Sequence, residues 1–494
     1  MPALRLLLLF IWFYSIFFLL FVYGDATPAA AGAAASDPED LDDNSSGVVF
    51  EMHHRHSASL GAESNNFGPP PKNRIDRTRQ LLDSDNVRRE MLSSHRIRLK
   101  TKQPAAWIPV HSGSDSGQGQ YFVSLRVGSP HPQKVILVTD TGSDLTWMNC
   151  QYSCKDCPKA GPHVGRIYKA SESTTFKTIP CSSDMCKVQL ANFFSLNRCP
   201  QPDTPCLFDY RYLSGREAIG VFANDTLTVG LHNRFKVRLH DVLIGCTRGY
   251  NGSEGFPDGV LGLGYRNHSL AVRLANTFGS KFSYCLVDHL SASNLKNYLS
   301  FGDIPLSEKP KMEYTKLILG VISSFYAIDI SGISLGNKRL NIPPEIWDAK
   351  GEGGMIIDSG TSLTMLAGAA YDEIVDTLRP VFNKFEKIKK EDELNLPEFE
   401  LCFGPKGYNS SMVPKLVFHF VDGSKFAPPI DSYIIDVADG VKCLGIVHLT
   451  WPGTSVLGNI MQQSHFWEFD IGNRKLGFGP STCVLSSESP KSGH

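Results

Sequence analysis

The sequence has little excess charge of either sign, because 49 Lys and Arg offset 50 Asp and Glu among 494 residues. A surface for nucleic acid needs a basic excess, so we expect no nucleic-acid partner. The 12 cysteines are too few for a scaffold built from disulfides. Apolar residues make up 42% of the chain, which excludes a mostly disordered protein. What remains is a large globular chain, long enough for about three domains.

Several motifs of other hydrolases are missing. The chain has no His-Glu-x-x-His stretch for metal-dependent proteolysis and no Gly-x-Ser-x-Gly elbow for a serine hydrolase. Cys150, Cys154 and Cys157 are close in sequence, but no second close cysteine pair or histidine pair completes a zinc site. We therefore expect neither a metal nor a cofactor.

Long apolar runs are scarce as well. The one run of nearly membrane-spanning length is residues 6–23, which follows Arg5 and precedes small residues. This pattern predicts a secretory signal peptide over residues 1–26, with Gly24 and Ala26 at the cleavage site. The alternative is a retained signal anchor, since about 18 apolar residues is the lower limit for a span. We predict cleavage, and hence no stable membrane span in the mature protein.

Entry into the secretory pathway has two consequences. It makes the cysteines available for disulfides, and it makes Asn-x-Ser/Thr sequences usable for glycosylation. The candidate glycosylation sites are Asn44, Asn224, Asn251, Asn267 and Asn409.

The composition changes along the chain. Residues 27–48 are rich in Ala, Asp and Ser, whereas residues 50–105 are rich in Arg and Lys, with a helical pattern around 74–99. We interpret residues 27–110 as a prosegment that covers an acidic site. The alternative is a solvated basic helix or linker.

From about residue 118 the pattern is that of an all-β protein. Short runs of β-branched and aromatic residues alternate with Gly, Asn, Asp and Pro. A helical period is clear only in residues 369–389. We divide this region into an N-terminal part, residues 111–304, and a C-terminal part, residues 305–494.

One motif occurs twice, once in each part. An apolar strand leads to Asp-Ser/Thr-Gly-Ser/Thr at Asp140 and again at Asp358, and Leu-Thr follows shortly after in both copies. Either copy alone reads as an ordinary turn after a strand, where Asp and Gly are favoured. Two copies in matching contexts instead predict a duplicated architecture with one aspartate in each half.

Paired carboxylates explain these residue types. Two neighbouring carboxyl groups cannot both ionise easily, so one is held as the anion and the other keeps a proton. The anion takes a proton from water and the acid polarises a carbonyl, so water attacks without a covalent intermediate. Small residues let the backbones approach, and hydroxyls orient the carboxylates. The predicted loop residues beside Asp140 and Asp358 are Thr141, Gly142, Ser143, Ser359, Gly360 and Thr361.

A second pair of segments follows the same order. GVLGLG covers residues 259–264 and SVLGNI covers residues 455–460. We expect each to pack beside one Asp loop, with Gly262 and Gly458 permitting a close crossing. The alternative is an ordinary strand with a bulge glycine.

Together with the two Asp loops, FSYCLVDHL (282–290), CLGI (443–446) and NIMQQ (459–463) make the chain resemble the pepsin-like aspartic proteases, specifically the plant nepenthesin-like group. The resemblance implies an all-β, bilobal pepsin-like acid protease fold with the active-site cleft between two β-barrel-like lobes. It implies an aspartic endopeptidase that acts on proteins or peptides, works as a monomer and uses Asp140 and Asp358. It implies the apoplast or the vacuole as the final compartment, with the plastid as the alternative.

The resemblance also implies a flap, a hairpin that closes over the substrate. The matching segment is residues 209–220, in which Tyr212 falls at the flap tyrosine and Gly215 near the tip. The Tyr212 phenol is expected to reach the Trp147 indole beside the aspartates. Ser214 and Arg216 depart from the family's Asp-Gly-Ser pattern, and Arg216 is expected to put a cation at the tip of the flap.

The nepenthesin-like pattern further implies a disulfide connectivity that spacing alone cannot supply. The implied pairs are Cys150–Cys154, Cys157–Cys246, Cys181–Cys206, Cys186–Cys199, Cys285–Cys483 and Cys402–Cys443.

Two expectations concern activity. The basic prosegment predicts a zymogen in which Arg and Lys pair with cleft carboxylates, and acid releases the segment as those carboxylates protonate. The rival to an enzyme is a non-catalytic binding or inhibitor protein on the same fold, since plant relatives of this architecture include inhibitors and storage-type globulins. The two intact Asp loops favour the enzyme.

Overall fold

The computed structural model describes residues 48–54, 73–79, 81–82, 85, 121–152, 166–190, 199, 201–211, 217–230, 236–251, 258–287, 297–302, 310–322, 324–388 and 396–483. Residues 1–44 and residues 45–494 are separate units, and all described residues belong to the second. Within this described part, no helix is both long enough and apolar enough to cross a membrane. The predicted signal peptide lies outside the described residues.

The N-terminal half is built around β3 (Gln133–Asp140), which ends at the first motif aspartate. Strand β3 runs parallel to β10 (Gly259–Gly262), and β10 runs antiparallel to β4 (Trp147–Gln151). Strand β4 in turn runs parallel to β9 (Lys236–Asn251). The β10 strand is the first of the two predicted glycine segments, and it lies beside the Asp loop as expected.

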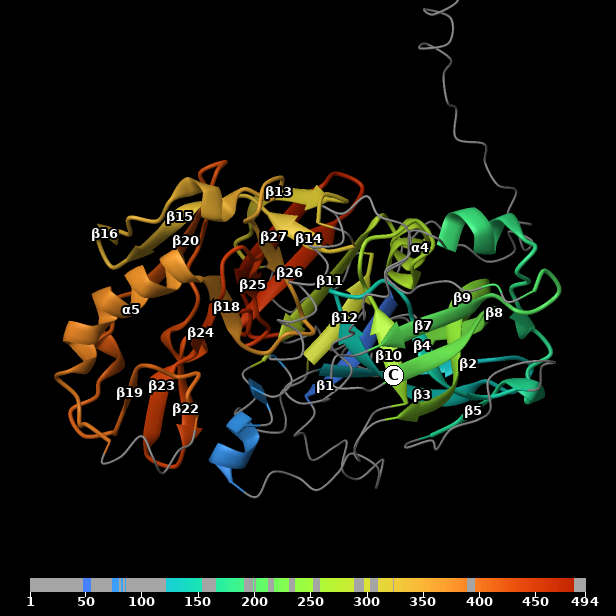
Figure 1. The fold of residues 1–494 in the computed structure, drawn as a ribbon, viewed down its shortest axis with the longest axis horizontal. Coiled ribbons are helices and arrows are strands. Elements are labelled where there is room, and N and C mark those ends of the chain that lie inside the picture. Colours follow the sequence, from blue (N-terminus) through green and yellow to red (C-terminus); the bar gives the residue numbers. More distant parts are fainter. Residues whose placement is uncertain are drawn as a thin grey trace, which may run out of the picture. The chain divides into compact units, whose positions relative to one another are not determined.

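The C-terminal half repeats this order of pairings. Strand β17 (Met355–Ile357) ends just before Asp358 and runs parallel to β25 (Ser455–Leu457). Strand β25 is antiparallel to β18 (Thr364–Ala367), which is parallel to β24 (Ile446–Leu449). The duplicated architecture predicted from the repeated motif is therefore confirmed, and Figure 1 shows the first set of strands in teal to green and the second in orange to red.

A third group of strands draws on both halves. Its order is β13–β27–β26–β11–β12–β1, with every neighbouring pair antiparallel. Strand β1 comes from the predicted prosegment and also pairs with β2. The predicted prosegment thus supplies backbone to a sheet that joins the two halves. The bounds are β1 (Val48–His54), β2 (Tyr121–Val127), β11 (Lys281–Leu286), β12 (Asn297–Phe301), β13 (Glu313–Leu319), β26 (His465–Asp470) and β27 (Lys475–Pro480).

The predicted C-terminal helix is present as α5 (Gly368–Phe382) and ends before the expected residue 389. Its buried face includes Ile374, Leu378 and Phe382, spaced four residues apart. The remaining elements are β5 (Tyr168–Lys169), η1 (Ala170–Glu172), β6 (Lys177–Thr178), η2 (Met185–Gln189), β7 (Leu207–Arg211), β8 (Glu217–Gly230), α4 (Leu270–Thr277), β14 (Tyr326–Ile328), β15 (Ile330–Leu335), β16 (Lys338–Arg339), η4 (Pro344–Trp347), β19 (Cys402–Phe403), η6 (Ser410–Met412), β20 (Leu416–Phe420), β21 (Lys425–Phe426), η7 (Ile430–Ser432), β22 (Ile434–Ala438) and β23 (Val441–Leu444).

The two disulfides predicted for the last four cysteines of the chain are confirmed. Cys402 and Cys443 are direct register partners on β19 and β23, and their sulfurs are bonded. Cys285 on β11 is bonded to Cys483, just beyond β27. This second bond ties the C-terminal end to the joining sheet.

The predicted pairings of Cys150 and Cys246 are wrong. These two residues are bonded to each other, so neither Cys150–Cys154 nor Cys157–Cys246 forms. They lie on the parallel neighbours β4 and β9, with their Cα atoms 5.2 Å apart. Strand pairing therefore decides this bond. Cys154 and Cys157 lie outside the described residues.

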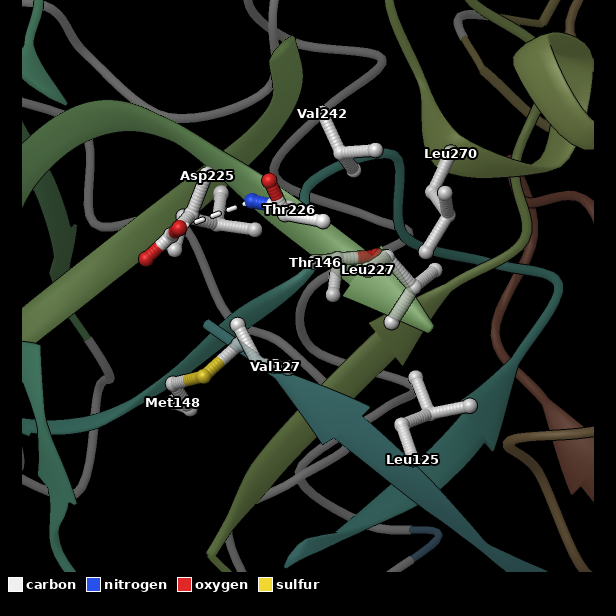
Figure 2. Close-up of a pocket in the computed structure, with 10 residues that line it drawn as sticks. Leu125, Val127, Thr146, Met148, Asp225, Thr226, Leu227, Val242 and Leu270 are labelled. Carbon is white, nitrogen blue, oxygen red and sulfur yellow. Dashed lines mark hydrogen bonds between the residues drawn. The ribbon is translucent and has the colours of Figure 1, made fainter. Parts of the chain in front are cut away.

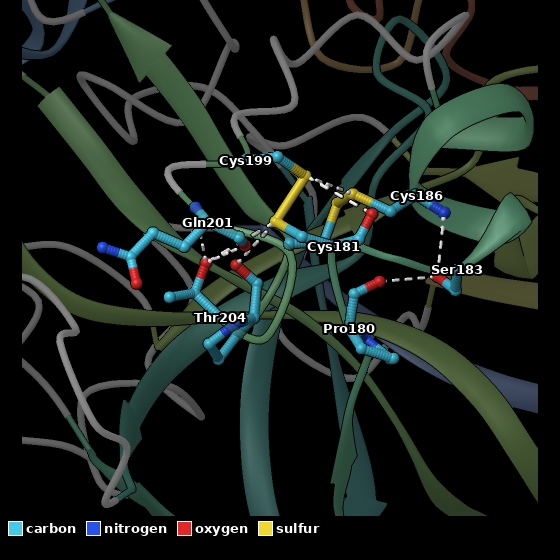
Figure 3. Close-up of a disulfide and its surroundings, with 9 residues drawn as sticks. Pro180, Cys181, Ser183, Cys186, Cys199, Gln201 and Thr204 are labelled. Atoms are coloured by element: carbon cyan, nitrogen blue, oxygen red, sulfur yellow. Dashed lines mark hydrogen bonds between the residues drawn. A yellow bond between two sulfur atoms is a disulfide. The ribbon is translucent and has the colours of Figure 1, made fainter.

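The predicted nested pairs are also wrong, because Cys181 is bonded to Cys199 and Cys186 to Cys206. Figure 3 shows Cys181, Cys186 and Cys199 gathered in one cluster. The Cys186 and Cys199 sulfurs, which are not bonded to each other, are only 3.3 Å apart. With cysteines this close, small differences in backbone position choose the partners, and sequence spacing carries no such information.

Candidate active site

Asp140 and Asp358 occupy equivalent places in the two halves. Asp140 is the last residue of β3, Asp358 directly follows β17, and both side chains are fully buried. The Gly142 N–H donates to Asp140 Oδ1 at 3.0 Å, and the Gly360 N–H donates to Asp358 Oδ1 at 2.9 Å. Each loop therefore turns tightly around its own carboxylate.

Thr141 and Ser359 lock the two loops together. The Thr141 N–H donates to Ser359 Oγ at 3.1 Å, and the Ser359 N–H donates to Thr141 Oγ1 at 2.9 Å. Each hydroxyl then donates to the carbonyl that precedes the other aspartate, at Ile357 (3.4 Å) and Thr139 (3.1 Å). Since Thr141 and Ser359 directly follow the aspartates, this reciprocal contact brings the two motifs to one place.

The two predicted orienting hydroxyls behave differently. Thr361 Oγ1 donates to Asp358 Oδ2 at 2.5 Å, as expected. The expectation for Ser143 is wrong, because its hydroxyl has no hydrogen-bond partner among the described residues. Ser143 acts through its backbone, whose carbonyl accepts from the Gly264 N–H at 2.8 Å. Thr361 therefore orients the Asp358 carboxylate through its hydroxyl, whereas Ser143 holds the first loop through its backbone.

The backbones of the two glycine segments pass so close to the Asp loops that a side chain would not fit between them. A Cβ on Gly262 would lie 2.7 Å from the Leu145 carbonyl oxygen, and one on Gly458 would lie 2.4 Å from the Leu363 carbonyl oxygen. Leu145 and Leu363 occupy the same position after their respective aspartates. The close crossing predicted for both glycines is therefore confirmed, because no larger residue fits between these backbones.

A buried polar network beneath Asp358 was missed by the sequence reasoning. Gln462 Nε2 donates to the Asp358 carbonyl at 3.1 Å, and Tyr284 donates its hydroxyl proton to Gln462 Oε1 at 2.5 Å. Asn459 Nδ2 donates to the Ser359 carbonyl at 3.1 Å. The NIMQQ segment was the available signal, but it served only as a mark of family resemblance.

The flap prediction is tested only in part by the structure. Strands β7 and β8 form an antiparallel hairpin that pairs Arg211 with Glu217, whereas Tyr212 and Gly215 lie outside the described residues. Trp147 is buried, and its Nε1 has no acceptor among the described residues. A contact between Tyr212 and the Trp147 indole stays a prediction.

The small cavity in Figure 2 belongs to the N-terminal core. Leu125, Met148, Val242 and Leu270 are among its lining residues, and neither Asp140 nor Asp358 is. The Asp225 carboxylate at its edge is already satisfied by donors that include the Thr226 N–H at 2.7 Å. This cavity is a packing feature and carries no chemistry.

The strand-end aspartates and their interlocked loops on two matching β halves define the class of the pepsin-like aspartic proteases. A family model described as Xylanase inhibitor N-terminal matches residues 121–303, and one described as Xylanase inhibitor C-terminal matches residues 325–480. The chain therefore belongs to the pepsin-like aspartic protease family, and its enzyme class is that of the aspartic endopeptidases.

Named relatives agree with this assignment. Aspartyl protease family protein 2 of Arabidopsis thaliana is 34% identical, over 76% of this chain and 73% of the relative. Aspartic proteinase nepenthesin-1 of Nepenthes gracilis is 32% identical, over 75% of this chain and 80% of the relative. The solved structure of Basic 7S globulin from soybean shares the fold, with a TM-score of 0.57 and 19% identity over 76% of this chain and 97% of that chain.

Proposed function

We propose that the protein hydrolyses peptide bonds with a water molecule activated jointly by Asp140 and Asp358. The observation that carries this proposal is the reciprocal Thr141–Ser359 contact, which holds the two aspartate loops against each other. Both carboxyl groups are buried, so they share one proton more readily than they carry two charges.

The reaction needs only these two groups and water. The ionised carboxylate takes a proton from water as the water oxygen bonds to the peptide carbonyl carbon. The protonated carboxyl group donates its proton to the carbonyl oxygen. The carboxyl group that took the water proton then donates it to the nitrogen of the tetrahedral intermediate, while the other carboxylate takes a proton from one of the intermediate's hydroxyl groups. The C–N bond breaks, which releases an amine and a carboxylic acid and leaves the dyad with one proton again. No covalent bond to the protein forms at any stage.

We further propose that the chain is made as a secretory zymogen that acts at acidic pH. The signal peptide (1–26), prosegment (27–110) and two lobes (111–304 and 305–494) remain the proposed division. The proposed destination is the apoplast or the vacuole, with the plastid as the alternative, which combines the predicted signal peptide with the family resemblance. Among the glycosylation candidates, exposure supports Asn267 and Asn409.

A non-catalytic binding or inhibitor protein is the second candidate. The description of the matching family models, Xylanase inhibitor, favours it. The intact loops argue against it, because Thr361 still donates to the Asp358 carboxylate and Gly142 to the Asp140 carboxylate.

The test is cleavage of a denatured protein by the purified, processed protein from acidic to neutral pH. We expect cleavage to be fastest in acid, because the dyad must hold one proton. We also expect pepstatin to block this cleavage. Cleavage insensitive to pepstatin would contradict the mechanism. Saturable binding of a protein partner with no cleavage at any pH would instead establish the second candidate.

A further inference from the structure

A short helical segment of the predicted prosegment packs against the C-terminal half. Helical residues are described at 74–79, 81–82 and 85, and Figure 1 shows this segment in blue beside β22 and β23. Thr78 Oγ1 donates to the Val437 carbonyl of β22 at 2.9 Å. Leu81 and Leu82 are buried in the same apolar cluster as Val437. Arg74 lies within ion-pair distance of Asp436 and Asp439, so the segment is anchored by charge as well as by apolar burial.

Asp85 extends this contact to the loop of the second aspartate. Its Oδ1 accepts from the Ser362 N–H at 2.7 Å and its Oδ2 accepts from the Leu363 N–H at 2.5 Å. Its side chain is buried, with 2% exposed. Ser362 directly follows Thr361, whose hydroxyl donates to Asp358. The Asp85 carboxylate thus lies against the catalytic loop itself.

A purely structural carboxylate offers a useful comparison. Asp258 also takes two backbone N–H donors, from Ile136 and Arg166, both at 2.7 Å. Asp258, however, braces the strands of its own half. Asp85 instead belongs to a segment predicted to be removed. It accepts from the Ser362 and Leu363 N–H groups, and buried N–H groups need a hydrogen-bond partner.

We propose that the Ser362–Leu363 amide pair is a carboxylate-binding subsite of the active site, which Asp85 occupies in the full chain to hold the protease inactive. Two adjacent backbone N–H groups match the two oxygens of one carboxyl group, and Asp85 accepts a hydrogen bond from each of them. The inhibitory part of this inference rests on the proposed peptidase function.

The pH dependence of this contact runs against the release predicted from the basic residues. Burial, aided by the negative charge of Asp358, raises the pKa of Asp85 from 3.8 to about 7. Docking therefore takes up a proton: the contact is most favourable below pH 3.8 and weakens as pH rises through about 7. Asp85 thus opposes release by acid, whereas the ion pairs of Arg74 with Asp436 and Asp439 weaken when those carboxylates protonate.

The first experiment measures amide hydrogen exchange in the full chain carrying Asp140→Asn, which prevents self-processing. We expect Asp85→Ala to reduce protection of Ser362 and Leu363 by about tenfold or more, since two buried hydrogen bonds are lost. The matched control is Asp76→Ala, a partly exposed aspartate of the same segment, which should leave protection unchanged. Unchanged exchange of the Ser362 and Leu363 amides in Asp85→Ala would overturn the proposed subsite. Unchanged protection of the amides of β26 would show that the variant folds.

A second variant tests the role of the proton. Asp85→Asn has one oxygen acceptor and no proton to take up, so protection of the amide pair should be lower than in the parent chain. In the parent, protection should decrease as pH rises through neutrality, and in Asp85→Asn this decrease should be absent. A pH dependence identical to that of the Asp140→Asn parent would contradict the role of Asp85.

The second experiment measures peptide hydrolysis by the unprocessed full chain with native Asp140. We expect Asp85→Ala to cleave a quenched peptide about tenfold or more faster than the native unprocessed chain. If the processed protein is active and this variant shows no gain, autoinhibition by Asp85 is overturned. If no form is active, the proposed peptidase function fails, and hydrogen exchange still decides the subsite.

Discussion

Replacing Asp358 with Asn is expected to reduce kcat for peptide hydrolysis by about 10⁴-fold. The amide keeps the shape of the carboxyl group and still offers an oxygen to the Gly360 N–H. It holds neither the negative charge nor the shared proton that the reaction needs. The measurement is the initial rate with a quenched peptide in acid, using processed protein.

The controls for this variant separate chemistry from folding. Asp431→Asn changes an exposed carboxylate and should leave kcat unchanged. Thermal unfolding of the Asp358→Asn variant should resemble that of the native protein. The Asp140→Asn, Asp358→Asn double variant should be no slower than the worse single variant, because the two groups act as one unit. Activity above a tenth of the native level in Asp358→Asn would contradict the dyad.

Replacing Gly458 with Ala is expected to lower the free energy of unfolding by about 3 kcal/mol and to remove most of the activity. The new Cβ would meet the Leu363 carbonyl carbon at 2.5 Å and the Ser362 carbonyl oxygen at 2.7 Å. These are backbone atoms of the loop that carries Asp358, so they yield only if that loop moves. Urea unfolding and peptide hydrolysis measure the two effects.

Gly230→Ala is the matched control for this substitution. Gly230 ends β8, and a Cβ there would meet nothing within 4 Å. The free energy of unfolding of the Gly230→Ala variant should differ from that of the native protein by less than about 0.5 kcal/mol. Equal stability of the Gly458→Ala and Gly230→Ala variants would show that the close crossing has no energetic importance.

Local sequence patterns predicted the catalytic elements well. The apolar run before Asp140 became β3, and the two glycine segments became β10 and β25, because their requirements are short-range. The hydroxyl of Ser143 was predicted wrongly because its twin Thr361 suggested a symmetry that side-chain packing does not respect. Asp85 was not predicted because its partners Ser362 and Leu363 are far away in sequence.

The sequence by itself determined the all-β class, the two aspartates and the glycines that let strands pass close to them. Each of these features depends on neighbours within a few residues, so the local sequence is enough to predict it. Tertiary structure alone decided that Cys150 bonds Cys246, that β1 enters the joining sheet and that Asp85 meets the second loop. Each of these joins residues far apart in sequence, and only packing of the whole chain selects among the possible partners.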